Sequence, residues 1–505
     1  MSGLSRRALL GAGASGLFLP SLAYGVQKPK IGARPKNVIF MVADGMSAGT
    51  LAMADQLLKL TQNRNSYWRG LLADPNAYRG HQETRSLNSL VTDSAAASSS
   101  WGSGRHIWNG ALNSLPGGTA LVPLYTLLGE KKVRRGLVTT TTMTHATPSG
   151  FAISHPTRDE EETIAVKYLA SGVEVLMGGG DKFFAPDRRK DGRDLYGDFA
   201  KAGYRLARNR DEMMAAAPGN LLGIFAPGQI PYSVDRANSP ELAAAVPSLV
   251  EMAKTAIDRL IGGKEGFFLQ IEGGRVDHAA HSNDLAALLN EQIEFEETLR
   301  MVLDFAMRDK ETLVVVTTDH GNANPGLMGG DDELLRSKKG LGSIAEMKGS
   351  YESFLSAAVQ NVLPYDEKVK ARQIGTDMER IVPVFREVLG LELSADEASF
   401  IGAAVRGQGP LKAIEGYNSK TSQVAVALSN HTHVGWSGNS HTSDHVILSA
   451  IGPGAEAFEG VVENISIFDT LLGFKGIKHQ NPTMTFEEAL KHREKTASVD
   501  EEHWS

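Results

Sequence analysis

Gly266–His281, with the sequence GFFLQIEGGRVDHAAH, joins a short apolar run to a cluster of acidic and imidazole side chains. The run Phe267–Ile271 is typical of a strand buried on both faces, as in a parallel sheet. Glu272 and two glycines follow it. If a helix begins after the glycines, Asp277 and His281 stand four residues apart and project from one face. A carboxylate and an imidazole placed in this way suit a zinc ion; the alternative is an acidic turn with surface histidines.

Outward from this stretch, apolar strand-like runs alternate with helical patterns. The predicted strands are 37–43, 89–91, 136–142, 173–177, 267–271, 312–318 and 446–451. The predicted helices are 48–60, 158–170, 240–259, 284–307, 350–362 and 378–389. Residues 181–240 show no strong pattern and are predicted to be surface excursions. Strands that alternate with helices predict an α/β fold with a large, mostly parallel central sheet and helices on both faces.

Acidic or hydroxyl side chains follow several of these predicted strands. Ligands of open α/β sheets bind at the carboxyl ends of the strands, so these side chains are expected to converge there. Each position alone has the alternative of a turn former or a helix cap. The positions are Asp44, Asp93, Ser94, Thr147, Glu272, Asp319 and His320.

The same positions offer ligands for more than one cation. The chain has no cysteine, so metal ligands must be oxygen atoms and imidazoles. Mixed carboxylate and imidazole sets suit zinc, whereas oxygen-only sets suit magnesium. The zinc candidates are Asp44, Asp277, His281, Asp319 and His320. The magnesium candidates are Thr147, Glu272 and the shared Asp44.

Ser94 stands directly before the alanine run Ala95–Ala97, which can begin a helix. Its side-chain oxygen would then face the positive end of the helix dipole. This placement favours a nucleophile that acts on an anionic phosphate. The alternative is a serine that merely caps the helix.

The composition is that of an ordinary globular protein. The chain has 505 residues, of which 42% are hydrophobic and 22% charged, and a formal net charge of −7. This charge argues against a general nucleic-acid binder. No run beyond the N-terminal region is long and apolar enough to span a bilayer.

The N-terminus contains two adjacent arginines, in Ser5–Leu10, ahead of a weakly apolar stretch, and Ser21–Ala23 offers small residues for cleavage. This arrangement resembles a twin-arginine export signal. Residues 1–23 are therefore predicted to be a signal peptide and 24–36 a linker, in a periplasmic or secreted protein. The alternative is a cytosolic protein with a flexible basic tail.

Taken together, six motifs resemble those of the alkaline phosphatase family, and they occur in the family's order between residue 37 and about residue 455. The serine motif is specific, and the complete set is far more so. The motifs are DGM at Asp44–Met46, VTDSAAA at Val91–Ala97, HATP at His145–Pro148, EGGRVDHAAH at Glu272–His281, TDH at Thr318–His320 and HT at His441–Thr442.

The resemblance implies a role for each matching position. The ligands of one zinc would be Asp277, His281 and His441. The ligands of a second zinc, which also meets the nucleophile Ser94, would be Asp44, Asp319 and His320. Magnesium would be held by Thr147, Glu272 and the shared Asp44. Arg158 would clamp the phosphate, and Asp93 would orient Arg158; a guanidinium can hold two phosphate oxygens at once.

The chain departs from the family pattern at several positions. Ser98 and Ser99 end the serine motif where the family usually has a smaller residue and then threonine. His145 and His278 stand where the enteric bacterial enzyme has aspartate and lysine and animal relatives have histidine. Imidazoles at these positions could recruit zinc in place of magnesium to the third site.

The long segment before His441 is expected to be an insertion. The resemblance implies a catalytic domain of residues 37–325 and 436–505, interrupted by a crown- or lid-like region of residues 326–435. It also implies a homodimer.

The expected activity is hydrolysis of small phosphate monoesters to an alcohol and inorganic phosphate, through a phosphoserine at Ser94. A phosphodiesterase on the same scaffold is one alternative. A secreted phosphate-binding protein without catalysis is another, although such a protein needs no serine at this position.

Overall fold

The computed structural model describes residues 32–329, 337–361 and 373–494. The predicted signal peptide and most of the predicted linker lie outside the described residues.

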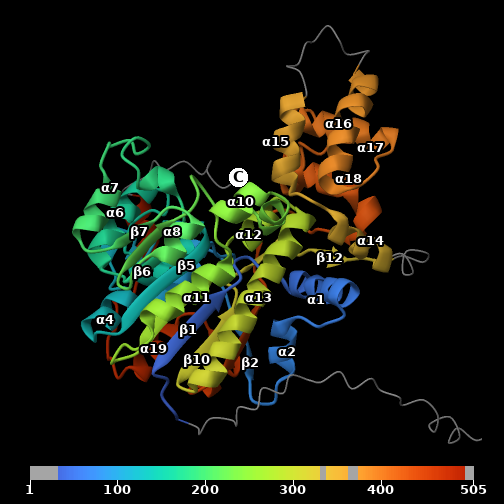
Figure 1. Ribbon diagram of the computed structural model, residues 1–505. Coiled ribbons are helices and arrows are strands. Elements are labelled where there is room, and N and C mark those ends of the chain that lie inside the picture. The colour runs from blue at the N-terminus through green and yellow to red at the C-terminus, as the bar shows by residue number, and fades with distance from the viewer. Residues whose placement is uncertain (1–31, 330–336, 362–372, 495–505) are drawn as a thin grey trace, which may run out of the picture.

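The centre of the molecule is a large sheet (Figure 1). Its strands are β1 Asn37–Val42, β2 Tyr78–Glu83, β5 Arg134–Thr142, β6 Val175–Gly179, β7 Arg205–Ala207, β8 Leu221–Ile224, β9 Phe267–Glu272, β10 Thr312–Thr317, β15 Val446–Ile451 and β16 Gly460–Glu463. These ten strands are ordered β16-β2-β15-β10-β1-β9-β5-β6-β8-β7. Among them only β15 runs in the opposite direction, because it pairs antiparallel with both β10 and β2. The prediction of a mostly parallel sheet is confirmed.

Helices cover both faces of this sheet, which explains why its central strands are apolar on both sides. Ile39 and Met41 of β1 face a core formed with α11 (Leu249–Leu260) and α13 (Leu285–Asp309). Val38, Phe40 and Val42 face the opposite core, formed with α3 (Ser94–Ser103), α5 (Ala146–Ala152) and α19 (Ser466–Phe474). The alternating side chains of one strand thus serve two separate cores.

The predicted strand at 89–91 is wrong. These residues form an irregular segment in which Leu90 is 78% exposed, and a turn joins Ser86 N to Ser89 O at 3.0 Å. The strand of this region is β2, which pairs with β15 and alternates buried and exposed side chains. Three apolar or neutral residues were too short a pattern to separate a strand from a turn.

The prediction that residues 181–240 are only surface excursions is also wrong. This region contains β7 and β8, which extend the sheet, and the helices α7 (Leu195–Lys201) and α8 (Arg210–Ala215). The two strands are so short that they leave little periodicity. The predicted helix 240–259 is in fact two helices, α10 (Pro240–Ala245) and α11, because Ser248 caps α11.

The register of the sheet places three strand ends at one edge. Val42 of β1 pairs with Thr317 of β10 and with Glu272 of β9. Asp44 and Asp319 each follow their strand by two residues; because β1 lies between β10 and β9, Asp44 is the neighbour of both Asp319 and Glu272. Acidic side chains at or just after the ends of three neighbouring strands therefore lie at the same edge of the central sheet.

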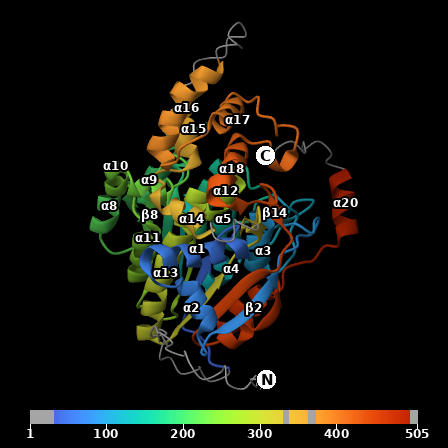
Figure 2. The same cartoon turned by 90° about the vertical axis from the view of Figure 1, so that its right-hand side faces the viewer.

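Helices between β12 (Gly326–Leu327) and β13 (Val434–Gly435) form a helical module that stands above the sheet in Figure 1, in orange, and in Figure 2. Its described helices are α14 Ser337–Ser343, α15 Tyr351–Asn361, α16 Gln373–Leu389, α17 Ala395–Val405 and α18 Lys420–Thr432. β12 and β13 pair with each other, so the module leaves and re-enters the body at one point. Its core is a separate apolar cluster that also includes side chains of α13 and of α1 (Ala48–Gln62).

No helix in the described parts of the chain is long and apolar enough to cross a membrane.

Substitution of Phe354 by alanine tests whether the helical module has its own core. Phe354 is fully buried, and its ring lies edge-on to Phe385 at 5.1 Å between centroids. The cavity should cost about 3–5 kcal/mol. We expect faster amide hydrogen exchange in α15–α18 while β1, β9 and β10 stay protected. Phe295→Ala, on the sheet-facing side of α13, is the control and should have the reverse effect. Equal deprotection of both regions by either variant would contradict a separate core.

Candidate active site

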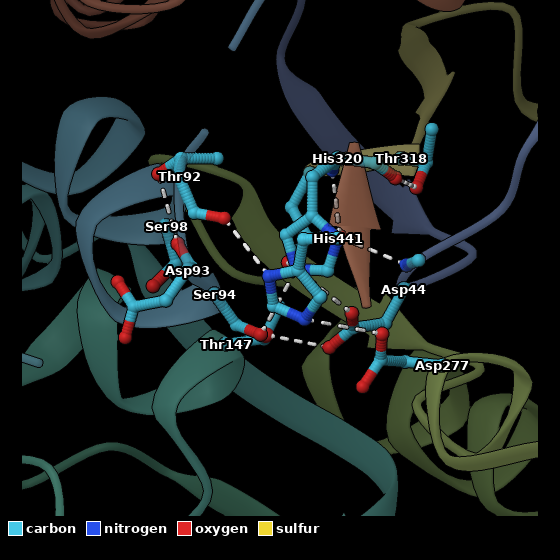
Figure 3. A network of polar contacts seen from close by, with 12 residues as sticks. Asp44, Thr92, Asp93, Ser94, Ser98, Thr147, Asp277, Thr318, His320 and His441 are labelled. Atoms are coloured by element: carbon cyan, nitrogen blue, oxygen red, sulfur yellow. Dashed lines mark hydrogen bonds and ion pairs between the residues drawn. The ribbon is translucent and has the colours of Figure 1, made fainter. Parts of the chain in front are cut away.

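Side chains from distant parts of the sequence converge beyond the edge where β1, β9 and β10 end. Figure 3 shows Asp44, Ser94, Asp277, His320 and His441 turned toward one another. His441 reaches this place because β11 (Gly321–Asn322) pairs with β14 (His441–Thr442). The rings of His320 and His441 are stacked with their centroids 3.6 Å apart.

The first candidate metal group consists of Asp277, His281 and His441, whose donor atoms lie within 4.8 Å of one another. Asp277 and His281 belong to α12 (Arg275–His281), so the predicted helix and its shared face are confirmed. His281 Nε2 lies 3.4 Å from Asp277 Oδ2, and His441 Nε2 lies 3.6 Å from Asp277 Oδ1. Asn322 Nδ2 donates to Asp277 Oδ1 at 2.7 Å and fixes that carboxylate.

The hydrogen bonds of the two histidines determine which nitrogen atoms can bind a metal. The Nδ1 atoms of His281 and His441 donate to the carbonyl oxygens of Asn439 and Thr92, at 2.7 and 2.9 Å. A carbonyl oxygen can only accept, so each neutral ring carries its proton on Nδ1. The two Nε2 lone pairs then face each other at 2.9 Å. A cation between them would turn this repulsion into coordination.

The second candidate group surrounds His320. Its Nε2 atom lies 3.3 Å from Asp319 Oδ2 and 3.7 Å from Asp44 Oδ1. The backbone N–H groups of Gly45 and His320 both donate to Asp319 Oδ1, at 3.1 Å. The remaining oxygens, Asp44 Oδ1 and Asp319 Oδ2, are buried and have no hydrogen-bond partner in the described structure. Asp44, Asp277 and His320 have donor atoms within 4.8 Å of one another, so Asp277 is shared between the first and second groups.

Ser94 is the first residue of α3, and its Oγ atom lies 3.2 Å from His320 Nε2. The cap of this helix is Asp93, whose Oδ1 accepts from Ala96 N at 2.9 Å. The alternative of a helix-capping serine is therefore wrong. Because Asp93 satisfies the end of the helix, the Ser94 hydroxyl is free to point at the second group.

Small residues let α3 pack closely against α5, which carries Thr147. Ser98 Oγ donates to Ala146 O at 3.0 Å. An added Cβ on Gly102 would come within 1.9 Å of Gly150 O, so the two backbones nearly touch there. Ser98 and Ser99, which depart from the family pattern, are fully buried; Ser99 Oγ accepts from Asn113 N at 2.9 Å.

The third candidate group consists of Asp44, His145 and Glu272. Thr147 Oγ1 donates to Asp44 Oδ2 at 2.9 Å, so this hydroxyl stands beside the group. His145 Nδ1 lies 3.8 Å from Glu272 Oε1. His145 Nδ1 and both carboxylate oxygens of Glu272 are buried without a hydrogen-bond partner among the described residues.

The buried carboxylates and imidazoles of these groups favour the binding of cations. Burial, reinforced by the neighbouring Asp319, raises the pKa of Asp44 well above its usual range. Burial also raises the pKa of Asp319 to about 6 and lowers the pKa of His320 to about 4. Buried charges without partners are costly, and natural proteins pair them or coordinate metals with them. The donor set and its unpartnered atoms therefore fit divalent cations.

Arg158 and Asp93 form an ion pair beside Ser94, with Arg158 Nη1 donating to Asp93 Oδ2 at 3.1 Å. Arg158 Nη2 donates to His145 Nε2 at 2.9 Å. The guanidinium therefore lies between α3, which carries Ser94, and the third group. His278 lies next to His145, with ring centroids 5.5 Å apart, and its Nδ1 accepts from Arg275 Nη1 at 3.2 Å.

Some groups that shape this site were not identified from the sequence. Asn322 follows Asp319 by three residues, and a polar side chain so close to a strand end was a usable signal. The carbonyls of Thr92 and Asn439 left no signal, because a backbone carbonyl is the same in every residue.

Comparison with known proteins agrees with this geometry. The family described as alkaline phosphatase matches residues 35–476. Alkaline phosphatase 3 of Bacillus subtilis (strain 168) is 30% identical over 88% of this chain and 89% of that protein. Repressible alkaline phosphatase of Saccharomyces cerevisiae is 35% identical over 57% of this chain and 55% of that protein.

The crystal structure of Thermus thermophilus alkaline phosphatase is also similar. It has a TM-score of 0.84 and 36% sequence identity, and the match covers 93% of this chain and 97% of that one. Family, relatives and structure agree over most of the chain: the chain belongs to the alkaline phosphatase family and is a phosphatase.

Proposed function

We propose that this protein hydrolyses phosphate monoesters by transferring the phosphoryl group first to Ser94 and then to water. The observation that carries the proposal is the position of Ser94 Oγ, 3.2 Å from His320 Nε2, within a group of buried carboxylates. A hydroxyl at the start of a helix and beside cation ligands is placed to attack an anionic phosphorus centre.

The cations proposed here are two zinc ions and one magnesium ion, with zinc as the alternative at the third site. One zinc would be held by Asp277, His281 and His441, and the other by Asp44, Asp319 and His320. The third ion would be held by Asp44, Thr147 and Glu272, with His145 and His278 close by. When bound, such ions neutralise phosphoryl charge and favour the deprotonated forms of a hydroxyl and of water.

The residues of this chain then have distinct parts in the reaction. Ser94 loses its proton, and its Oγ atom bonds to phosphorus while the bond from phosphorus to the ester oxygen breaks. The alcohol leaves and takes up a proton. Water then attacks the phosphoserine, which releases inorganic phosphate and returns the proton to Ser94. Arg158 holds the phosphoryl oxygens throughout, and Asp93 keeps the guanidinium in place.

Arg158 supports a monoester rather than a diester as the substrate. A guanidinium binds two oxygens in a fork. A monoester has three unsubstituted oxygens, so two can meet Arg158 while the third stays available to the cations, whereas a diester has only two. The guanidinium is mostly buried, with its side chain 16% exposed.

Location and assembly are also part of this proposal. The twin arginines Arg6 and Arg7 support export to the periplasm or the medium, although they lie outside the described residues. A homodimer remains a prediction from the family resemblance.

Substitution of Ser94 by alanine should abolish the covalent phosphoenzyme. We expect turnover to fall roughly 10³-fold or more, because the nucleophile is lost. Ser100→Ala, on the same buried helix, is the control and should keep its turnover. Mass spectrometry after an acid quench detects the phosphoserine. A phosphorylated Ser94→Ala protein would refute the assignment.

Chelation should remove activity, and zinc and magnesium together should restore it. Elemental analysis should find zinc in the purified protein, and His281→Ala should lose about one zinc ion per chain, because one ligand of a three-residue group is missing. His431→Ala, in the helical module, is the matched control and should keep its full metal content. Equal metal content in the two variants would contradict the proposed ligands.

Substitution of Arg158 by alanine should raise the inhibition constant for inorganic phosphate by about 10–100-fold, since a buried bidentate contact is lost. Turnover of an aryl phosphate monoester should fall far more than turnover of its methyl diester. Arg158→Lys keeps the charge without the fork and should recover only part of the loss. If phosphate inhibits Arg158→Ala as well as the parent, Arg158 is not the clamp.

A further inference from the structure

The chain continues past α19 into a segment that returns to the neighbourhood of the nucleophile. We call residues 479–486 the C-terminal strap. It lies outside the segment that matches the family, which ends at residue 476. The strap leads into α20 (Phe486–Glu494), which stands at the right-hand edge of the molecule in Figure 2.

Asn481 attaches the strap to the body. Its side chain is 3% exposed, and Nδ2 donates to the carbonyls of Ser103 and Val122 at 2.9 and 3.0 Å. Val122 N donates back to Oδ1 at 2.8 Å. Ser103 ends α3, and Val122 directly follows the loop 104–121, which contains the short strands β3 (Ser114–Leu115) and β4 (Thr119–Ala120). One amide therefore joins the two ends of the loop 104–121.

The strap also contacts residues within that loop. Arg105 Nε donates to the carbonyls of Asn481 and Pro482, at 2.8 and 3.2 Å. Phe486 stacks on Trp108 with ring centroids 6.3 Å apart. Met484 packs against a small apolar cluster that contains Ala96, Ile107, Ala111, Leu115 and Leu121. Ala96 belongs to the first turn of the nucleophile's helix, so this cluster joins strap, loop and helix.

The loop in turn holds both members of the Asp93–Arg158 pair. Gly110 N donates to Asp93 Oδ2 at 3.0 Å, and Arg158 N donates to Gly110 O at 2.7 Å. Asp93 N donates to Asn109 Oδ1 at 3.2 Å. Asn109 and Gly110 lie between Trp108, which stacks on Phe486, and Ala111, which belongs to the apolar cluster against which Met484 packs.

We infer that the C-terminal strap is a positioning element for the phosphate clamp. It holds residues 108–111, and these residues hold the carboxylate and the backbone of the Asp93–Arg158 pair. The inference rests on the proposed role of Arg158. A clamp must hold two oxygens in a fixed geometry, and small displacements of a positioned group weaken binding steeply. Strap residues should therefore affect phosphate binding without touching phosphate.

The test uses the full-length, metal-loaded enzyme and the variant Asn481→Ala/Met484→Ala. We expect the inhibition constant for inorganic phosphate and the KM for an aryl phosphate to rise about 10-fold, with kcat and metal content changed far less. Leu490→Ala on α20, beyond the strap, is the matched control and should leave both constants unchanged. Phe486→Ala, which removes only the stack on Trp108, should give a smaller rise and replaces the double variant if that protein does not fold.

The strap variant is also measured in the Arg158→Ala background. If the strap acts through the clamp, its effect on phosphate binding disappears there; a general structural defect would weaken binding equally in both backgrounds. An unchanged inhibition constant in the strap variants, or an effect that persists without Arg158, would overturn the inference while leaving the clamp intact. If Arg158→Ala itself leaves phosphate binding unchanged, the proposed clamp fails, and the strap inference fails with it.

Discussion

Four buried carboxylates at one edge of the sheet impose the main constraint on this structure. Asp44 and Asp319 follow β1 and β10, Glu272 ends β9, and Asp277 lies in α12. All four are less than 5% exposed. Like charges at this depth repel one another and lose their hydration, so the arrangement is costly without cations. The parallel sheet holds the carboxylates together because its strands end in register. Metal binding and stability of this edge are therefore linked.

The imidazoles depend on a second layer of contacts. A two-residue ladder, β11–β14, places His441 next to His320 although more than a hundred residues separate them in sequence. Backbone carbonyls then fix the tautomers of His281 and His441. The histidines and the backbone groups that orient them thus come from different parts of the chain.

The sequence predicted those parts of the structure that produce long, regular patterns. The strand and helix in Gly266–His281 could be predicted because an apolar run, two glycines and a four-residue spacing each leave a clear signal. The prediction of a strand at 89–91 was wrong, and β7 and β8 were not predicted. Segments of three or four residues are too short to show a periodic pattern. The contacts of Asn109 and Gly110 with Asp93 and Arg158 could not be predicted, since most of them are made by the backbone of Gly110. Convergence of the site residues could be expected only because parallel strands end at a common edge.

The β12–β13 ladder has a consequence for how this scaffold can change over evolutionary time. The segment that carries the helical module begins at Leu327 and ends at Val434, and these two residues pair with each other. Changes in the length or sequence of this segment should therefore leave the strands of the central sheet in place. A replacement segment would still need apolar side chains that pack against those of α1 and α13, such as Met53 and Leu285. A lineage that discarded the helical module would need polar replacements there to remain free of aggregation.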